Sequence, residues 1–143
     1  MIVVDSSVWI DFFKGHFTPV TAKLSDALVS RDVLVGDLIL CEVLKGARSD
    51  KHANVFELTM RRCKLVKICS MELAIAAAEY HRQLRAKGFT VRSTVDLLIG
   101  TYCIKHRHTL LHSDRDFDAM EQHLGLQVVP THYMVNEPRL AYG

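Results

Sequence analysis

The sequence contains no run of apolar residues long enough to cross a membrane. The longest run, Leu73–Ala78, is far shorter than the ~20 residues that a membrane-spanning helix needs. Glycine and proline are scarce, at 7 and 3 of 143 residues, which excludes collagen-like and low-complexity chains. Because the apolar fraction of 49% is enough for a packed core, we expect a folded domain of ordinary size.

The sequence also lacks a C-x-x-C pair, and its four cysteines are scattered. In a chain large enough to bury a core, scattered cysteines are typical of reduced thiols. The first residues reach Asp5 without a basic segment, which is unlike a secretory signal. We therefore expect a cytoplasmic protein that does not associate with a membrane.

Short β-branched runs alternate with longer helical patterns along the chain. The predicted strands are Ile2–Asp5, Val33–Gly36, Leu65–Ile68, Thr109–His112 and Gln127–Val129. Helical patterns fill the segments between them, and Asp37 is expected to cap one of these helices. Strands that alternate with helices predict an α/β fold, with a parallel sheet covered on both faces.

Acidic residues recur just after the predicted strands or at the starts of helices. They are Asp5, Glu42, Asp96, Asp114 and Asp116. Ligands of parallel α/β sheets bind beyond the carboxyl ends of the strands, so we expect these carboxylates to converge. Clustered carboxylates raise one another's pKa unless a cation lies among them. An all-oxygen set of this kind suits Mg²⁺ or Mn²⁺.

Capping is the alternative role for the aspartates, because acidic side chains favour helix N-termini. Ser93 and Ser113 each precede an aspartate by three residues, which is the spacing of a capping box. Glu42 lies past the first turn of its helix, where a cap is no longer useful. Gly100, one turn after Asp96, is expected to leave open space above that carboxylate.

Four segments, taken in order, resemble the PIN-domain ribonucleases of the VapC type, which are toxins of bacterial toxin–antitoxin pairs. The segments are VVDSSVWI at 3–10, LILCEVLKG at 38–46, VDLLIG at 95–100 and LLHSDRDF at 110–117. The resemblance covers residues 1–130 and implies a three-layer α/β/α sandwich around a short parallel sheet. We expect residues 1–130 to form one PIN-like nuclease domain and residues 131–143 to form a C-terminal tail.

The resemblance implies roles for individual residues. The catalytic residues would be Asp5, Glu42, Asp96 and Asp114. The metal ligands would be Asp5, Asp96, Asp114 and Asp116. Either Asp114 or Asp116 could be the fourth acidic residue of the family pattern, and Asp114 is favoured because it is nearer to the strand. Contacts to water or phosphate would come from Ser6, Ser7 and Arg92.

The implied function is that of an endoribonuclease toxin dependent on Mg²⁺, with Mn²⁺ as a possible substitute. A metal-activated water would cleave RNA phosphodiester bonds, and a cognate VapB-like antitoxin would neutralise the toxin, which is expected to be a homodimer. The alternative is a catalytically inactive PIN-fold module that acts through RNA or protein binding.

Three further patterns bear on these alternatives. The basic clusters at 61–67 and 82–87 are either solvated helix faces or contacts to RNA. The aromatic stretch at 9–17 is either core or, as the resemblance suggests, partly an antitoxin contact. The group Cys103, His106, His108 and His112 matches no standard zinc motif, so we do not expect a zinc site.

Overall fold

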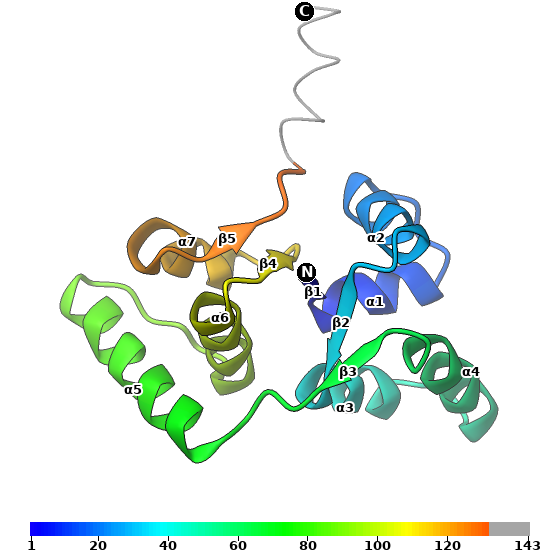
Figure 1. The fold of residues 1–143 in the computed structure, drawn as a ribbon, viewed down its shortest axis with the longest axis horizontal. Helices are drawn as coiled ribbons and strands as arrows, with labels where there is room; N and C mark the ends of the chain where they lie inside the picture. The colour runs from blue at the N-terminus through cyan, green and yellow to red at the C-terminus, as the bar shows by residue number, and fades with distance from the viewer. Residues whose placement is uncertain (132–143) are drawn as a thin grey trace, which may run out of the picture.

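The computed structural model of the chain describes residues 1–131, and its centre is a five-stranded sheet (Figure 1). The strands are β1 (Ile2–Val4), β2 (Val33–Gly36), β3 (Lys64–Val66), β4 (Thr109–Leu111) and β5 (Gln127–Val128). All neighbouring pairs are parallel, in the order β3-β2-β1-β4-β5. The predicted parallel sheet is therefore confirmed. All but the first residue of the expected tail at 131–143 lies outside the described residues.

Helices cover both faces of the sheet, as Figure 1 shows. One face carries α1 (Ser6–Phe13), α2 (Pro19–Val29), α3 (Asp37–Lys45) and α4 (Asp50–Met60). The other carries α5 (Met71–Ala86), α6 (Thr94–His106), the 3₁₀ helix η1 (Arg115–Phe117) and α7 (Asp118–Leu124). The structure confirms the three-layer α/β/α architecture. Among residues 1–131, no helix has the length and apolarity needed to span a bilayer.

The order of the strands reverses at the centre of the sheet. From β1 the chain builds outward through β2 to β3, and it then returns to the other side of β1 to add β4 and β5. β1 and β4 are direct neighbours, with Val4 aligned to Leu111. The next residue, Asp5, extends this pairing by donating its N–H to the Leu111 carbonyl at 3.0 Å. A reversal of this kind opens a crevice at the carboxyl ends of the two strands.

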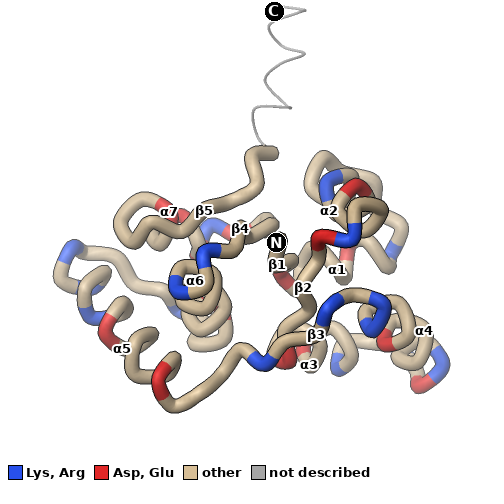
Figure 2. Tube along the Cα trace, in the orientation of Figure 1, with Lys and Arg blue, Asp and Glu red and all other residues tan. Residues whose placement is uncertain are grey.

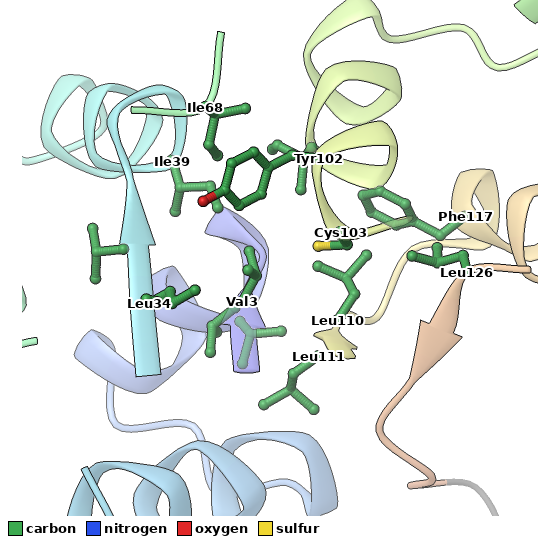
Figure 3. Packing of buried hydrophobic residues seen from close by; sticks show 14 of the residues in the cluster. Val3, Leu34, Ile39, Ile68, Tyr102, Cys103, Leu110, Leu111, Phe117 and Leu126 are labelled. Atoms are coloured by element: carbon green, nitrogen blue, oxygen red, sulfur yellow. The ribbon is translucent and has the colours of Figure 1, made fainter. Parts of the chain in front are cut away.

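The core lies between the sheet and its two helix layers (Figure 3). Val3, Leu34 and Leu110 of three adjacent strands are almost completely buried, as is Cys103 on α6. Strands that are covered on both faces need apolar residues throughout, which explains the short continuous runs of Val, Ile and Leu. The core fixes the strand ends and thus the groups that follow them.

The space next to Gly100 differs from the sequence-based expectation. A Cβ atom at this position would lie 2.6 Å from the Met120 sulfur. The space that we expected to be open above Asp96 is therefore filled by Met120 of α7. Glycine at this position allows α7 and η1 to pack closely against α6, which brings the segment after β4 close to the first turn of α6.

Asp37 does not occupy the predicted N-cap of α3, because that position belongs to Gly36. The Asp37 carboxylate accepts the backbone N–H groups of Leu38 and of Ile68, both at 2.9 Å. The second bond reaches the segment that follows β3, so Asp37 ties two adjacent connections together. This role depends on a contact that the local sequence pattern does not contain.

Candidate active site

The carboxyl edge of β1 and β4 brings together all five acidic side chains that the sequence singled out. Carboxylate oxygens of Asp96, Asp114 and Asp116 lie within 4.8 Å of one another. Asp5 and Glu42 are close enough to raise the pKa of Asp96 by repulsion. The five residues come from the position after β1, from α3, from α6 and from the segment after β4, so only the folded chain makes this cluster.

Asp5 is the most deeply buried of the five carboxylates, with 3% of its surface exposed. It stands at the N-cap position of α1, yet its side chain makes no capping hydrogen bond. Its Oδ2 atom accepts the Ser7 hydroxyl at 2.8 Å, while its buried Oδ1 has no partner within residues 1–131. Burial raises the pKa of Asp5, and the Ser7 hydrogen bond partly offsets this. The unpartnered oxygen indicates a position for a ligand rather than a cap.

The two serines after Asp5 orient carboxylates. The Ser6 hydroxyl donates to Glu42 Oε1 at 3.0 Å, which connects the start of α1 to α3. The Ser7 hydroxyl donates to Asp5 and lies 3.4 Å from the Ser113 hydroxyl. Each serine therefore positions one acidic side chain, and its oxygen lone pairs stay available to accept a hydrogen bond from water.

The turn after β4 is shaped by Asp114 and His112. Asp114 Oδ1 accepts the Asp116 N–H at 2.9 Å, so Asp114 rather than Ser113 caps η1, and the predicted Ser113 capping box is wrong. The Asp114 N–H donates to His112 Nδ1 at 3.1 Å. Asp116 makes no capping bond with its own carboxylate. Capping therefore accounts for one carboxylate oxygen of Asp114, but it does not account for the carboxylate of Asp116.

His112 is a residue of this site that the sequence analysis considered only as an unlikely zinc ligand. The predicted strand Thr109–His112 ends one residue early, at Leu111, so His112 leaves the sheet at the same edge as Asp5. Its ring packs on Phe117, with 4.8 Å between the ring centroids. Burial lowers the pKa of His112, and the Asp5 charge opposes this shift. Its position directly after a strand was the signal that could have identified it.

The remaining members of the possible zinc group lie elsewhere. Cys103 is buried in the core. The ring of His106 packs at a tilt against Tyr102 with 4.2 Å between the ring centroids, and His108 precedes β4, at the opposite edge of the sheet from His112. The structure thus places His112 at one end of β4 and His106 and His108, whose ring centroids are 6.2 Å apart, at the other.

Repulsion among the carboxylates is strongest at Asp96. Burial and then the charges of the other four acidic residues raise its pKa to about 7. A divalent cation would replace this repulsion by attraction. The oxygen-only donor set and the unpartnered Asp5 oxygen fit a hard cation such as Mg²⁺ or Mn²⁺.

We expect Asp96→Asn to stabilise the metal-free protein above pH 7. The folded-state pKa of Asp96 lies above its unfolded value, so ionisation destabilises the fold progressively from about pH 4 to pH 7. Because Asp96 is partly exposed, solvent screening reduces the expected gain to on the order of 1 kcal/mol. Thermal melting in EDTA of wild type and variant across this pH range measures the difference, and other titrating groups cancel. Equal stability at pH 8 would contradict the repulsion described here.

Comparison with known proteins identifies the family to which this arrangement belongs. The profile of the PIN domain family matches residues 2–122. The chain belongs to the PIN domain family. Among curated proteins, it is 29% identical over 129 residues to ribonuclease VapC11 of Mycobacterium tuberculosis and to a VapC ribonuclease of Mycobacterium bovis. Each alignment covers 89% of this chain and 96% of the relative, so the resemblance to VapC-type proteins is confirmed.

Solved structures share the fold of this PIN domain at low sequence identity. VapBC2 from Rickettsia felis, bound to a DNA fragment from its promoter, matches with a TM-score of 0.72 and 15% identity. This match covers 90% of the present chain and 98% of the other. FitAcB from Neisseria gonorrhoeae matches with a TM-score of 0.67 and 16% identity, over 92% and 98% of the two chains.

Proposed function

We propose that this PIN-domain protein is a Mg²⁺-dependent endoribonuclease and the toxin of a toxin–antitoxin pair. The observation that carries the proposal is the convergence of five carboxylates around an unpartnered Asp5 oxygen at the point where the strand order reverses. The VapC ribonucleases among its relatives support RNA as the substrate class. Because the proposed substrate is RNA, we propose that the protein acts in the cytoplasm, where RNA is translated.

The acidic residues of this site would have different roles in the reaction. Asp5, Asp96, Asp114 and Asp116 would hold a divalent ion, which supplies a water of lowered pKa and positive charge beside the scissile phosphate. Glu42, which Ser6 holds by a hydrogen bond, would accept the proton of the attacking water. In-line attack on phosphorus would break the bond to the 3′ oxygen, which would take a proton from solvent, so that the products carry a 5′-phosphate and a 3′-hydroxyl.

Arg92 would contact a substrate phosphate near the carboxylates. It is exposed and lies just before Ser93, the N-cap of α6, within one turn of Asp96. In EDTA, we expect Arg92→Ala to weaken RNA binding several-fold, because a phosphate contact is lost. We expect Asp96→Asn to strengthen it, because the neutralised pocket repels phosphate less. Fluorescence anisotropy with a labelled RNA measures both, and equal losses in the two variants would contradict this electrostatic picture.

A groove between α1, α3 and α4 fits the expected VapB-like antitoxin. It has a volume of about 470 Å³, and its apolar wall includes Ile10, Phe13 and Phe56. The rings of Phe13 and Phe56 stack with 4.2 Å between their centroids. Lys14 and Arg48 line the same groove, so the occupant would combine apolar side chains with acidic ones. Several solved neighbours are complexes of the VapBC type, which supports a partner of this class.

The aromatic stretch at 9–17 divides between the two roles considered for it. Trp9 is fully buried and belongs to the core, whereas Phe13 is half-buried and lines the groove. Phe17 is 98% exposed. We propose that an antitoxin segment covers Phe13 and its neighbours, and that a basic antitoxin side chain enters the acidic site and competes with the metal.

Growth of the host organism tests the toxin assignment. Expression of the wild-type chain alone should arrest growth, whereas Asp5→Asn should not. Co-expression of the cognate antitoxin should restore growth and yield a stable complex on pull-down. Growth arrest that is equally strong with Asp5→Asn would instead favour the alternative, an inactive PIN module that acts through binding. Light scattering of the purified chain would test the proposed homodimer.

A further inference from the structure

The edge of the sheet opposite the carboxylates carries a concentration of unpaired positive charge. The connections that lead into β2, β3 and β4 begin at this edge, and Figure 2 shows Lys and Arg segments on all three. We infer that this edge is a second RNA-binding surface, which takes the phosphodiester backbone of RNA away from the cleavage site. The inference rests on the proposed function for its choice of RNA as the ligand.

A hollow of about 500 Å³ lies at this edge between the end of α2 and the connection from α4 to β3. Its lining includes the exposed cations Arg31, Arg62 and Lys64 around the apolar Leu28 and Val33. Within the described part of the chain, none of the three cations forms an ion pair. The hollow therefore presents three free cations around a common space.

The neighbouring Arg61 differs from these three cations because it forms an ion pair. Its Nε atom lies 2.7 Å from Glu57 Oε2 on the preceding turn of α4. Arg61 does not line the hollow. The segment thus holds one arginine that is neutralised by the protein and another, Arg62, whose charge is left for a ligand.

The backbone supports a functional reason for arginine at this edge. In residues 1–131, five residues have a positive φ angle, and three of them are glycines. The other two are Arg31 and Arg107, each with φ of 57°. Arg31 follows the C-cap of α2 and Arg107 is the C-cap of α6, and they come shortly before β2 and β4. Glycine is the residue that suits a left-handed position after a helix, so the chain accepts strain to keep two cations here.

Positively charged groups at this edge of the sheet affect the pKa of His108. Burial lowers the pKa of His108, which immediately precedes β4, and the charge of the N-terminal ammonium and then those of His106 and Lys64 lower it further. Asp32, next to Arg31, is exposed and forms no ion pair among the described residues, so its negative charge offsets one of the cations. The exposed cations Arg31, Arg62, Lys64 and Arg107 outnumber it, and the resulting positive charge attracts a polyanion.

RNA is the polyanion that the geometry favours. The cations that line the hollow are joined by Arg107 on the connection that leads into β4, and this spread over three connections suits a run of phosphates. β2 spans four residues, or about 13 Å at 3.3 Å per residue. The two edges of the sheet are therefore about one strand length apart, and an RNA strand held at both would follow the surface of the helix layers between them.

The test compares the double variant Arg62→Gln/Lys64→Gln with the matched control Arg61→Gln. Binding of a 30-nucleotide and a 6-nucleotide RNA is measured by anisotropy in EDTA, over a range of salt concentrations. We expect the double variant to bind the long RNA about 10-fold more weakly at low salt. Its plot of log affinity against log salt should be less steep by about 1.4, because two phosphate contacts are lost. The control should match wild type.

A third variant, Arg31→Gly, separates binding from folding. It removes a charge and also relieves backbone strain, so we expect a higher melting temperature together with weaker binding of the long RNA. Wild-type affinity for the long RNA in all variants would overturn the inference. So would a loss of antitoxin binding without a loss of RNA binding, which would assign the surface to a protein. These measurements need no cleavage, so an inactive wild-type enzyme would refute the proposed function alone.

Discussion

Asp5→Asn and Asp96→Asn should each reduce the rate of Mg²⁺-dependent RNA cleavage by about 10²-fold or more. Substitutions in the outer shell of a metal site already reduce affinity or activity by 10–100-fold, and both residues are proposed direct ligands. Asn retains the size of Asp but removes the charge that would hold the cation. Time courses with an end-labelled RNA at saturating Mg²⁺ measure the loss.

The matched control for these variants is Asp26→Asn. Asp26 is exposed on α2, outside the acidic site, and no ion pair involves its side chain among the described residues. This variant should cleave at the wild-type rate. If Asp5→Asn or Asp96→Asn also cleaved at the wild-type rate while remaining folded, the assignment of the site would be wrong.

Phe56→Ala should weaken antitoxin binding by about 30-fold or more while leaving cleavage unchanged. The ring forms one wall of the groove and stacks on Phe13. Aromatic side chains at the centre of interfaces often contribute ~2 kcal/mol or more to binding, which corresponds to this factor. Calorimetric titration with the antitoxin measures the affinity, and the variant should continue to cleave RNA in the presence of antitoxin.

Leu58→Ala is the control for Phe56→Ala, because Leu58 is on the same helix, is 66% exposed and does not line the groove. It should bind the antitoxin like wild type. Arg48→Glu provides a second test that does not disturb the packing, since Arg48 is exposed at the groove. Wild-type antitoxin affinity in both Phe56→Ala and Arg48→Glu would place the antitoxin on a different surface.

The sequence predicted the layers of the fold and the members of the acidic cluster because these depend on local patterns. Short β-branched runs mark the strands, and the position of an acid after a strand places it at the carboxyl edge of the sheet. Asp5 and Asp114 follow that rule, whereas the signal for Asp96 was its place in the first turn of a helix, α6. The rule does not depend on the order of the strands in the sheet, and therefore the sequence alone predicts which edge these carboxylates occupy.

The features that the sequence missed depend on contacts between distant segments. The side chain of Met120 fills the space next to Gly100, and the Asp37 carboxylate binds the backbone of Ile68. The bond from the Asp114 N–H to His112 forms only because β4 ends one residue earlier than predicted. Charge counts likewise could not show that Arg61 is paired whereas Arg62 forms no ion pair within residues 1–131. Pairwise geometry of this kind is absent from a pattern of residue types.

The acidic site is proposed to cleave RNA with the help of a divalent cation. This claim is tested most directly by following one end-labelled RNA with the purified wild-type chain, first in EDTA and then after excess Mg²⁺ is added. We expect no cleavage in EDTA and prompt cleavage after Mg²⁺, with products that carry 5′-phosphate and 3′-hydroxyl ends. Cleavage that proceeds equally well in EDTA, or an intact RNA after Mg²⁺ is restored to the folded protein, would contradict the claim.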